Sequence, residues 1–251
     1  MLLQMETSIY RHRELASTND EAMRIAQEGA PAFTAVVADS QNAGRGRNGR
    51  AWISPKGTGL YASLILRPRV TVADIPLMTL LCGLSAAEAI RQTTNLNALI
   101  KWPNDILINM RKVAGILCEA SISSQESPIV IAGLGVNVNT LPQDLPERPL
   151  FPATSLMAES GLHNDRDLIL TRWIERTRHW SHVLENDGSR GVVEAWNELD
   201  ALRGTGICVT QPAGSELAGI AAGADSEGRL LLLTGDGALH KVVAGDVRRN
   251  V

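Results

Sequence analysis

Residues 129–139 read IVIAGLGVNVN, and the alternation of bulky and small residues in this stretch is the strongest indication of how the chain folds. In a β-strand, successive side chains point to opposite faces of the sheet. One face of this strand would be apolar, with Ala132, Leu134, Val136 and Val138. The other would be almost bare, with Gly133, Gly135, Asn137 and Asn139. The stretch therefore predicts a strand that packs on a core with one face and leaves the other open.

Two interpretations of the bare face remain open. A ligand that approaches the backbone closely would need a face without side chains, whereas turn residues at a strand end would produce the same pattern without a function. Glycine weakens strands and asparagine is depleted in them, so neither residue type is there to stabilise the strand itself. We favour the ligand interpretation.

The segments around this strand predict a chain in which strands and helices are mixed. Further strands are predicted at residues 33–38, 59–66, 98–102, 106–108 and 112–121. Helices are predicted at residues 18–28, 76–93, 167–184 and 191–199, and Thr18 with Glu21 fits an N-terminal capping box for the first of them. From residue 206 onward short strands alternate with glycine-containing turns, which predicts a small all-β unit.

The composition argues against several classes of protein. A chain of 251 residues can bury roughly 70–75% of the surface of its unfolded state. The net charge of −3 provides no general positive field for nucleic acid or for an anionic membrane. We find no apolar run of about 18 residues and no signal-like segment in the first thirty residues. A cytoplasmic globular protein is expected.

Residues 44–50 read GRGRNGR and satisfy the letters of the dinucleotide-binding fingerprint. That fingerprint needs a helix directly after the glycines, and the following residues 51–57, AWISPKG, cannot continue as one. A P-loop is also excluded, because no Gly-Lys-Ser/Thr closes the run. We predict a mobile loop whose glycine amides and Arg45, Arg47 and Arg50 contact phosphate or carboxylate oxygens. The alternative is a solvated loop without a ligand.

Lysine is rare in this chain, which has only Lys56, Lys101, Lys112 and Lys241 among its 24 cationic side chains. Lys101 opens the sequence KWPND at residues 101–105, and Lys112 precedes an apolar run. A compact ammonium with three donors is not interchangeable with a planar guanidinium. Their use here predicts functional positions, although a lone lysine at a strand end is more simply a surface charge.

Several of these segments together resemble those of the bacterial biotin protein ligases, in the order of that family and over essentially the whole chain. They are STN at residues 17–19, Gln41, GRGRNGR at 44–50 with Trp52, KWPND at 101–105, KVAGIL at 112–117 and GLGVN at 133–137. The resemblance implies an α+β fold with a mixed β-sheet and flanking helices, like that of class II synthetases. It places a catalytic ligase domain at residues 1–203 and a small SH3-like β-barrel at residues 204–251.

The resemblance also implies roles for individual residues. Catalysis would fall to Lys112, Arg47 and Arg45, with Lys112 between the biotin carboxylate and the α-phosphate. Biotin would be bound by Ser17, Thr18, Asn19, Gln41, Gly44, Arg45, Arg47, Lys112, Gly115, Gly133 and Gly135. The nucleotide would be bound by Arg47, Arg50, Trp52, Lys101, Asn104 and Asn137, and Asp105 would contact Mg²⁺. Without the resemblance, Trp52 would be taken for a core residue.

The implied activity is ligation of biotin, activated by ATP with Mg²⁺, to a lysine of a biotin carboxyl carrier protein. Only about sixteen residues precede Ser17, so no DNA-binding repressor segment and no nucleic-acid partner are expected. Members of the family often pair through the central sheet, so the resemblance allows a homodimer without deciding the oligomeric state. A lipoate or octanoate ligase is a rival, but its Arg-Gly-Gly type of loop is absent. An RNA-binding protein is a second rival, against which the acidic balance and the 4% aromatic content argue.

Overall fold

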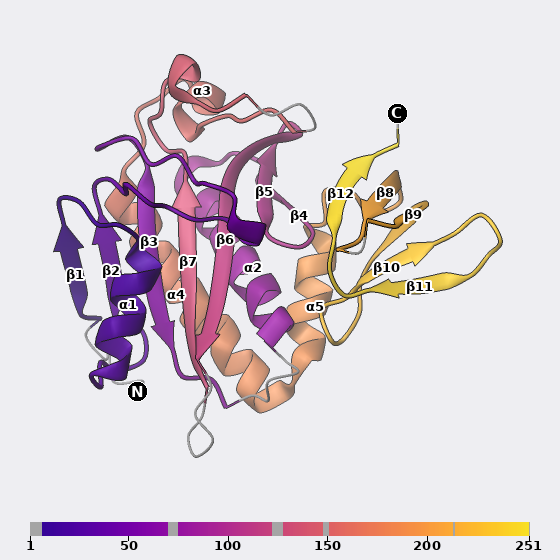
Figure 1. The fold of residues 1–251 in the computed structure, drawn as a ribbon, viewed down its shortest axis with the longest axis horizontal. Helices are drawn as coiled ribbons and strands as arrows, with labels where there is room; N and C mark the ends of the chain where they lie inside the picture. The colour runs from indigo at the N-terminus through magenta and orange to yellow at the C-terminus, as the bar shows by residue number, and fades with distance from the viewer. Residues whose placement is uncertain (1–6, 70–74, 122–127, 148–150, 213, 251) are drawn as a thin grey trace.

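The computed structural model describes residues 7–69, 75–121, 128–147, 151–212 and 214–250. Its larger part is a seven-stranded sheet with the order β1-β2-β3-β7-β6-β5-β4 (Figure 1). Only the pair β1 and β2 is parallel, and the other neighbours are antiparallel. The strands are β1 (Ile9–His12), β2 (Ala35–Ala38), β3 (Leu60–Leu66), β4 (Leu99–Lys101), β5 (Asp105–Ile108), β6 (Arg111–Ser121) and β7 (Ile129–Val136).

Helices cover both faces of this sheet. The main core lies between the sheet and α2 (Ile75–Thr94), α4 (Arg166–Asp187) and α5 (Ser189–Glu198). On the opposite face α1 (Thr18–Gln27) packs through Ala22, Ile25 and Ala26 onto β2, β3 and β7 (Figure 1). The short α3 (Leu156–Ser160) and the 3₁₀ turns η1 (Arg47–Gly49) and η3 (Pro142–Asp144) lie in connections.

Strand β7 has the two faces that its sequence predicts. Ala132 and Leu134 belong to the main core, whereas Ile131 belongs to the small core under α1. Beyond Ile131 on the α1 face come Gly133 and Gly135, so the apolar packing under the helix gives way to bare backbone. The mixed sheet with flanking helices is confirmed.

A second, five-stranded antiparallel sheet follows, with the order β11-β10-β9-β8-β12. Its strands are β8 (Gly206–Thr210), β9 (Glu216–Ala224), β10 (Leu230–Leu233), β11 (Leu239–Val242) and β12 (Asp246–Arg249). The Trp102 indole connects this second sheet to the part of the chain that contains the seven-stranded sheet, because its Nε1 donates to the Gly228 carbonyl at 3.0 Å. Asn197 of α5 also exchanges two hydrogen bonds with the Ala224 backbone, at 3.1 and 2.7 Å.

The predicted capping box at the start of α1 is wrong. Ser17 is the N-cap residue, and the cap makes no side-chain hydrogen bond. Glu21 instead pairs with Arg24 at 2.7 Å, and the Thr18 hydroxyl contacts Gln41 and Ser63 rather than the helix backbone. Tertiary contacts have therefore taken the groups that the local pattern assigned to capping.

Within the described part of the chain, we find no helix that is both long and apolar enough to cross a membrane.

Candidate active site

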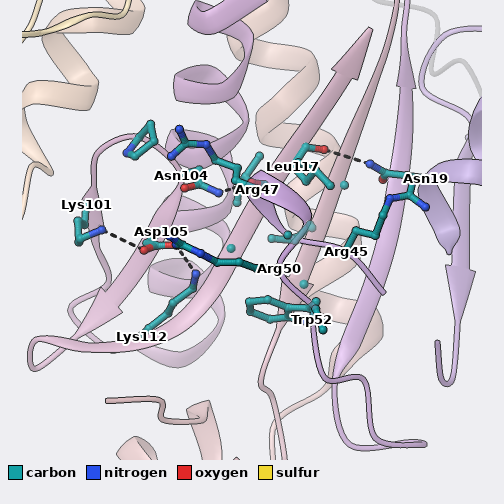
Figure 2. Close-up of a pocket in the computed structure, with 18 of the residues that line it drawn as sticks. Asn19, Arg45, Arg47, Arg50, Trp52, Lys101, Asn104, Asp105, Lys112 and Leu117 are labelled. Carbon is teal, nitrogen blue, oxygen red and sulfur yellow. Dashed lines mark hydrogen bonds and ion pairs between the residues drawn. The ribbon is translucent and has the colours of Figure 1, made fainter. Parts of the chain in front are cut away.

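A cavity of about 330 Å³ lies over the bare face of β6 and β7. Its walls come from the start of α1, the loop at residues 41–56, the turn before β5, and β12 of the second sheet. The predicted site residues that line it are Ser17, Thr18, Asn19, Gln41, Arg45, Arg47, Arg50, Trp52, Lys101, Asn104, Asp105, Lys112, Gly115, Gly133 and Gly135. Figure 2 shows Asn19 and Arg45 at one side, Lys101, Asp105 and Lys112 at the other, and Trp52, Arg47 and Arg50 between them.

One end of the cavity is polar and closely hydrogen-bonded. The extended backbone of Ser17 turns the chain into α1, and this leaves the N–H of Thr18 pointing out of the helix. That N–H donates to Gln41 Oε1 at 2.8 Å, while Gln41 Nε2 donates to Ser54 Oγ at 3.1 Å. The side chains of Ser17, Thr18 and Gln41 thus bring hydroxyl and amide groups together in a buried corner.

The bare floor of the cavity is approached closely, but by the protein's own side chains. A Cβ added at Gly133 would lie 2.3 Å from Asn19 Oδ1, and one at Gly135 would lie 2.5 Å from the Trp52 indole. Gly115 on β6 faces the same indole, with 3.2 Å from its ideal Cβ position to Trp52 Cζ3. The glycines allow Asn19 and Trp52 to lie flat on the sheet, and the cavity opens beside them.

The other end of the cavity is a buried group of two lysines and one aspartate. Lys101 Nζ lies 3.1 Å from one Asp105 carboxylate oxygen, and Lys112 forms an ion pair with the other. Burial alone would raise the pKa of Asp105, but the two ammonium groups outweigh it and lower that pKa to about 2. Lys112 Nζ also lies 5.4 Å from the Trp52 ring centroid. The group carries one excess positive charge into the cavity.

The three arginines of the loop differ in their partners. Arg45 donates to both oxygens of Asp20, at 2.8 and 2.5 Å, and lies 3.4 Å from Glu119. Its charge is therefore offset within the protein by these carboxylates. The predicted contact of Arg45 with ligand carboxylate and phosphates stays a prediction. Arg50 forms an ion pair with Asp246 of β12.

Arg47 is the exception among these arginines. It is half-buried, and burial lowers its pKa while the more distant Asp246 and Asp105 oppose the shift; a guanidinium stays protonated nonetheless. Among the residues that the structure describes, no carboxylate lies within ion-pair distance of it. A partly desolvated cation of this kind is suited to receive an anionic ligand.

Three predicted residues have scaffolding contacts. Asn104 Nδ2 donates to the Ile116 carbonyl at 2.7 Å, which ties the turn before β5 to β6 at the cavity wall. Asn137 does not line the cavity, and its Nδ2 donates to the Thr154 carbonyl at 3.0 Å. Gly44 also lies behind the wall, because a Cβ there would meet the Trp52 carbonyl at 2.7 Å.

Sequence reasoning missed several residues around the cavity, and Ser63, Asp246 and Phe151 are among them. Ser63 is completely buried on β3 and contacts Thr18 and Asn19, and the one signal for it was a hydroxyl inside the apolar run LYASLIL at residues 60–66. Asp246 had no local signal, because its partner lies in a distant loop. Phe151 lines the cavity with its ring centroid 4.9 Å from Lys101 Nζ.

The residues do not form a dedicated metal cage. Across the described ranges, no group of three or more His, Cys, Asp or Glu side chains is placed to hold a metal ion. Asp105, the predicted Mg²⁺ contact, already has two ammonium partners. Mg²⁺ commonly keeps several waters and binds through substrate phosphates with one or two carboxylates. The cavity therefore fits an ion that arrives with a nucleotide, and not one held by the protein alone.

Comparison with known proteins agrees with this geometry. Residues 12–137 match the Biotin/lipoate A/B protein ligase family, and residues 207–248 match the Biotin protein ligase C terminal domain. The chain is 37% identical to the "Bifunctional ligase/repressor BirA" of Bacillus subtilis (strain 168), over 94% of this chain and 72% of that protein. It is 33% identical to the "Biotin--[acetyl-CoA-carboxylase] ligase" of Paracoccus denitrificans, over 86% of this chain and 90% of that protein.

Among solved structures, the chain is similar to the biotin protein ligase from Aquifex aeolicus in complex with biotin and ATP. The TM-score is 0.84 at 28% sequence identity, and the match covers 98% of this chain and 100% of that one. Sequence, fold and both matched segments agree. The chain belongs to the Biotin/lipoate A/B protein ligase family, and within that family it is a biotin protein ligase.

Proposed function

We propose that this cavity binds biotin and ATP together and joins them as biotinyl-5'-AMP, from which biotin passes to a lysine of a biotin carboxyl carrier protein. The observation that carries the proposal is the layout of the cavity. A neutral hydrogen-bonding corner at one end and a cationic group at the other are joined by a floor of glycine and tryptophan. This order of surfaces along the cavity suits a ligand with a polar head, an apolar chain and a carboxylate beside a polyphosphate.

Biotin is proposed to place its ureido ring in the polar corner formed by Ser17, Thr18 and Gln41. Its chain then runs past Trp52 toward the lysines. The other predicted biotin residues form the floor or the wall of this part of the cavity, or lie behind its wall. They are Asn19, Gly44, Arg45, Gly115, Gly133 and Gly135. Arg45 is assigned to holding the loop against α1 and β6, because its guanidinium is engaged by Asp20 and Glu119.

The first chemical step is proposed to occur beside Lys112 and Arg47. An oxygen of the biotin carboxylate attacks the α-phosphorus of ATP, the bond from that phosphorus to the β-phosphate oxygen breaks, and pyrophosphate leaves. Two anions must approach each other for this, so a compact ammonium and an unpaired guanidinium lower the barrier through positioning and charge. Lys101, Arg50, Trp52, Asn104 and Asn137 are assigned to the nucleotide end, with Asn137 acting through the backbone that it holds.

The second step needs no nucleophile from this chain. The amine of the carrier lysine attacks the acyl carbon, the acyl–phosphate bond breaks, AMP leaves, and an amide forms with loss of a proton. The mixed anhydride would hydrolyse in water, so the wall made by the loop at residues 41–56 has the further task of excluding solvent. Mg²⁺ bound to the nucleotide would neutralise phosphate charge, and Asp105 would be the carboxylate that contacts it.

Further assignments follow from the same proposal. A catalytic domain at residues 1–203 and a second domain at residues 204–251 would share the active site through Arg50 and Asp246. We place the enzyme in the cytoplasm, where ATP and carboxylases are found, and the resemblance to family members that pair allows a homodimer. The net charge of −3 supports the absence of a nucleic-acid partner.

The direct test is to incubate the protein with biotin, Mg-ATP and a biotin carboxyl carrier domain, and to look for labelled carrier by mass spectrometry. Labelling should require ATP and release AMP and pyrophosphate. Lipoate in place of biotin should give no product, because its dithiolane ring has no N–H for the polar corner. Lipoyl transfer at a rate comparable with biotin would contradict the proposed substrate.

A further inference from the structure

A buried hydroxyl lies beneath the polar corner of the cavity. Ser63 has no exposed surface, and it faces Gly133 of β7 across the sheet. Its Oγ lies 2.6 Å from Asn19 Oδ1 and 2.8 Å from Thr18 Oγ1. A hydroxyl has a single proton, so Ser63 cannot donate to both oxygens at once. The groups around them decide which contact receives that proton.

The Asn19 amide can face only one way. Its Nδ2 donates to the Leu117 carbonyl at 3.3 Å and to Glu119 Oε2 at 2.6 Å. A flipped amide would place its oxygen against a carbonyl and a carboxylate, both of which only accept hydrogen bonds. Asn19 Oδ1 therefore points to Ser63. Because Oδ1 has no hydrogen, the Ser63 proton must lie between them.

The contact between the two hydroxyls then requires the proton of Thr18. When Thr18 Oγ1 donates to Ser63, its lone pairs are left for the cavity. Gln41 Oε1 still receives the Thr18 backbone N–H at 2.8 Å, which is shorter than its 3.1 Å distance to Thr18 Oγ1. The Thr18 hydroxyl therefore becomes a hydrogen-bond acceptor toward the ligand.

We propose that Ser63 is a positioning residue which, held by Asn19, fixes the Thr18 hydroxyl as an acceptor and so selects a ligand that presents an N–H there. The inference rests on the proposed function, because the cyclic urea of biotin carries two ring N–H groups. A ligand with a ring oxygen at that point would set one lone pair against another. A buried polar site rejects such an isostere far more strongly than a loose pocket does.

The test compares biotin with its two isosteres in which one or the other ring N–H is replaced by oxygen. Dissociation constants are measured by calorimetry for the wild-type protein, Ser63→Ala, Thr18→Val and the double variant. The matched control is Ser85→Ala, because Ser85 is also completely buried but donates to the Leu81 carbonyl of its own helix. Unfolding curves for each variant verify the fold.

Wild type should prefer biotin over one isostere by at least about tenfold, and Ser63→Ala should reduce that preference by about tenfold, because Thr18 can then turn and donate. Thr18→Val should reduce it as well, and the double variant no further, since both act on one hydroxyl. A Ser63→Ala protein that binds all three ligands more weakly but keeps the preference would overturn the proposal, as would additive effects. If Ser63→Ala does not fold, Ser63→Gly takes its place with the same outcomes, because glycine also lacks the hydroxyl. Wild type that binds no biotin would refute the proposed function, and the inference with it.

Discussion

Replacing Lys112 by arginine should remove most of the adenylate-forming activity, although the positive charge is kept. The Lys112 side chain is only 12% exposed, and it lies between Asp105 and the Trp52 ring, whose centroid is 5.4 Å from Nζ. A guanidinium is planar, broader than an ammonium, and prefers a two-pronged contact with a carboxylate. In this space it would bind Asp105 in that way, and its remaining N–H groups, fixed in the same plane, would not replace the Lys112 ammonium at the reacting oxygens.

The expected loss follows from removing one preorganised donor to developing charge, which slows such steps by about 10²–10³, or about 2.7–4 kcal/mol. Lys112→Ala should fall at least as far. The fold should persist in both, because Lys101 remains 3.1 Å from Asp105 and keeps that buried carboxylate paired.

The assay is biotin-dependent release of pyrophosphate from ATP, followed by labelling of the carrier from supplied biotinyl-5'-AMP. Supplied adenylate should restore part of the labelling, because its phosphorus chemistry is complete. The control is Lys241→Arg, since the Lys241 side chain is 56% exposed and lies outside the cavity. A near-normal rate of adenylate formation by Lys112→Arg would refute the assignment of Lys112.

Three further predictions concern the loop and the buried carboxylate. Arg47→Ala should keep the fold but release biotinyl-5'-AMP, which a trapping assay would detect; full retention of the intermediate would contradict the role given to this arginine. Arg50→Ala and Asp246→Ala should each weaken ATP binding with little effect on stability, because exposed ion pairs contribute about 0–1 kcal/mol, and independent effects in the double variant would argue against a functional pair. The pKa of Asp105 is lowered from its ordinary value of 3.8 to about 2. The ionised carboxylate therefore contributes about 2 kcal/mol to the free energy of unfolding. This contribution is present above the ordinary pKa and is lost as the pH falls through about 2. In urea titrations, Asp105→Asn should therefore lose less stability than wild type between about pH 5 and pH 2, and equal losses would count against the pairing.

The sequence predicted the strand at β7 well because periodicity is a local property. Alternation along the chain places Gly133 and Gly135 on one face whatever the rest of the protein does. It could not show what fills the space above them, since Asn19 and Trp52 come from segments far away. The same limit explains the capping box, where contacts across the fold took the Thr18 hydroxyl away from its local role.

The partners of charged residues were the least predictable part of the site. Residues 44–50 show that three arginines lie in one loop, and nothing in that segment distinguishes them. The structure does, because Asp20 and Glu119 engage Arg45 and Asp246 engages Arg50, whereas no described carboxylate lies within ion-pair distance of Arg47. Each distinction depends on a carboxylate that the fold brings in from elsewhere, so it required the three-dimensional arrangement.

The ion pair between Arg50 and Asp246 joins positions 196 residues apart, and Asp246 begins β12, the last strand that the structure describes. Among the described strands, β12 pairs with β8 alone, at the edge of its sheet. Domains fold as the nascent chain leaves the ribosome, from the N-terminus onward. The cavity wall is therefore completed only after β12 has been synthesised, so a shortened translation product that stops before β12 would have a folded first sheet and an incomplete cavity.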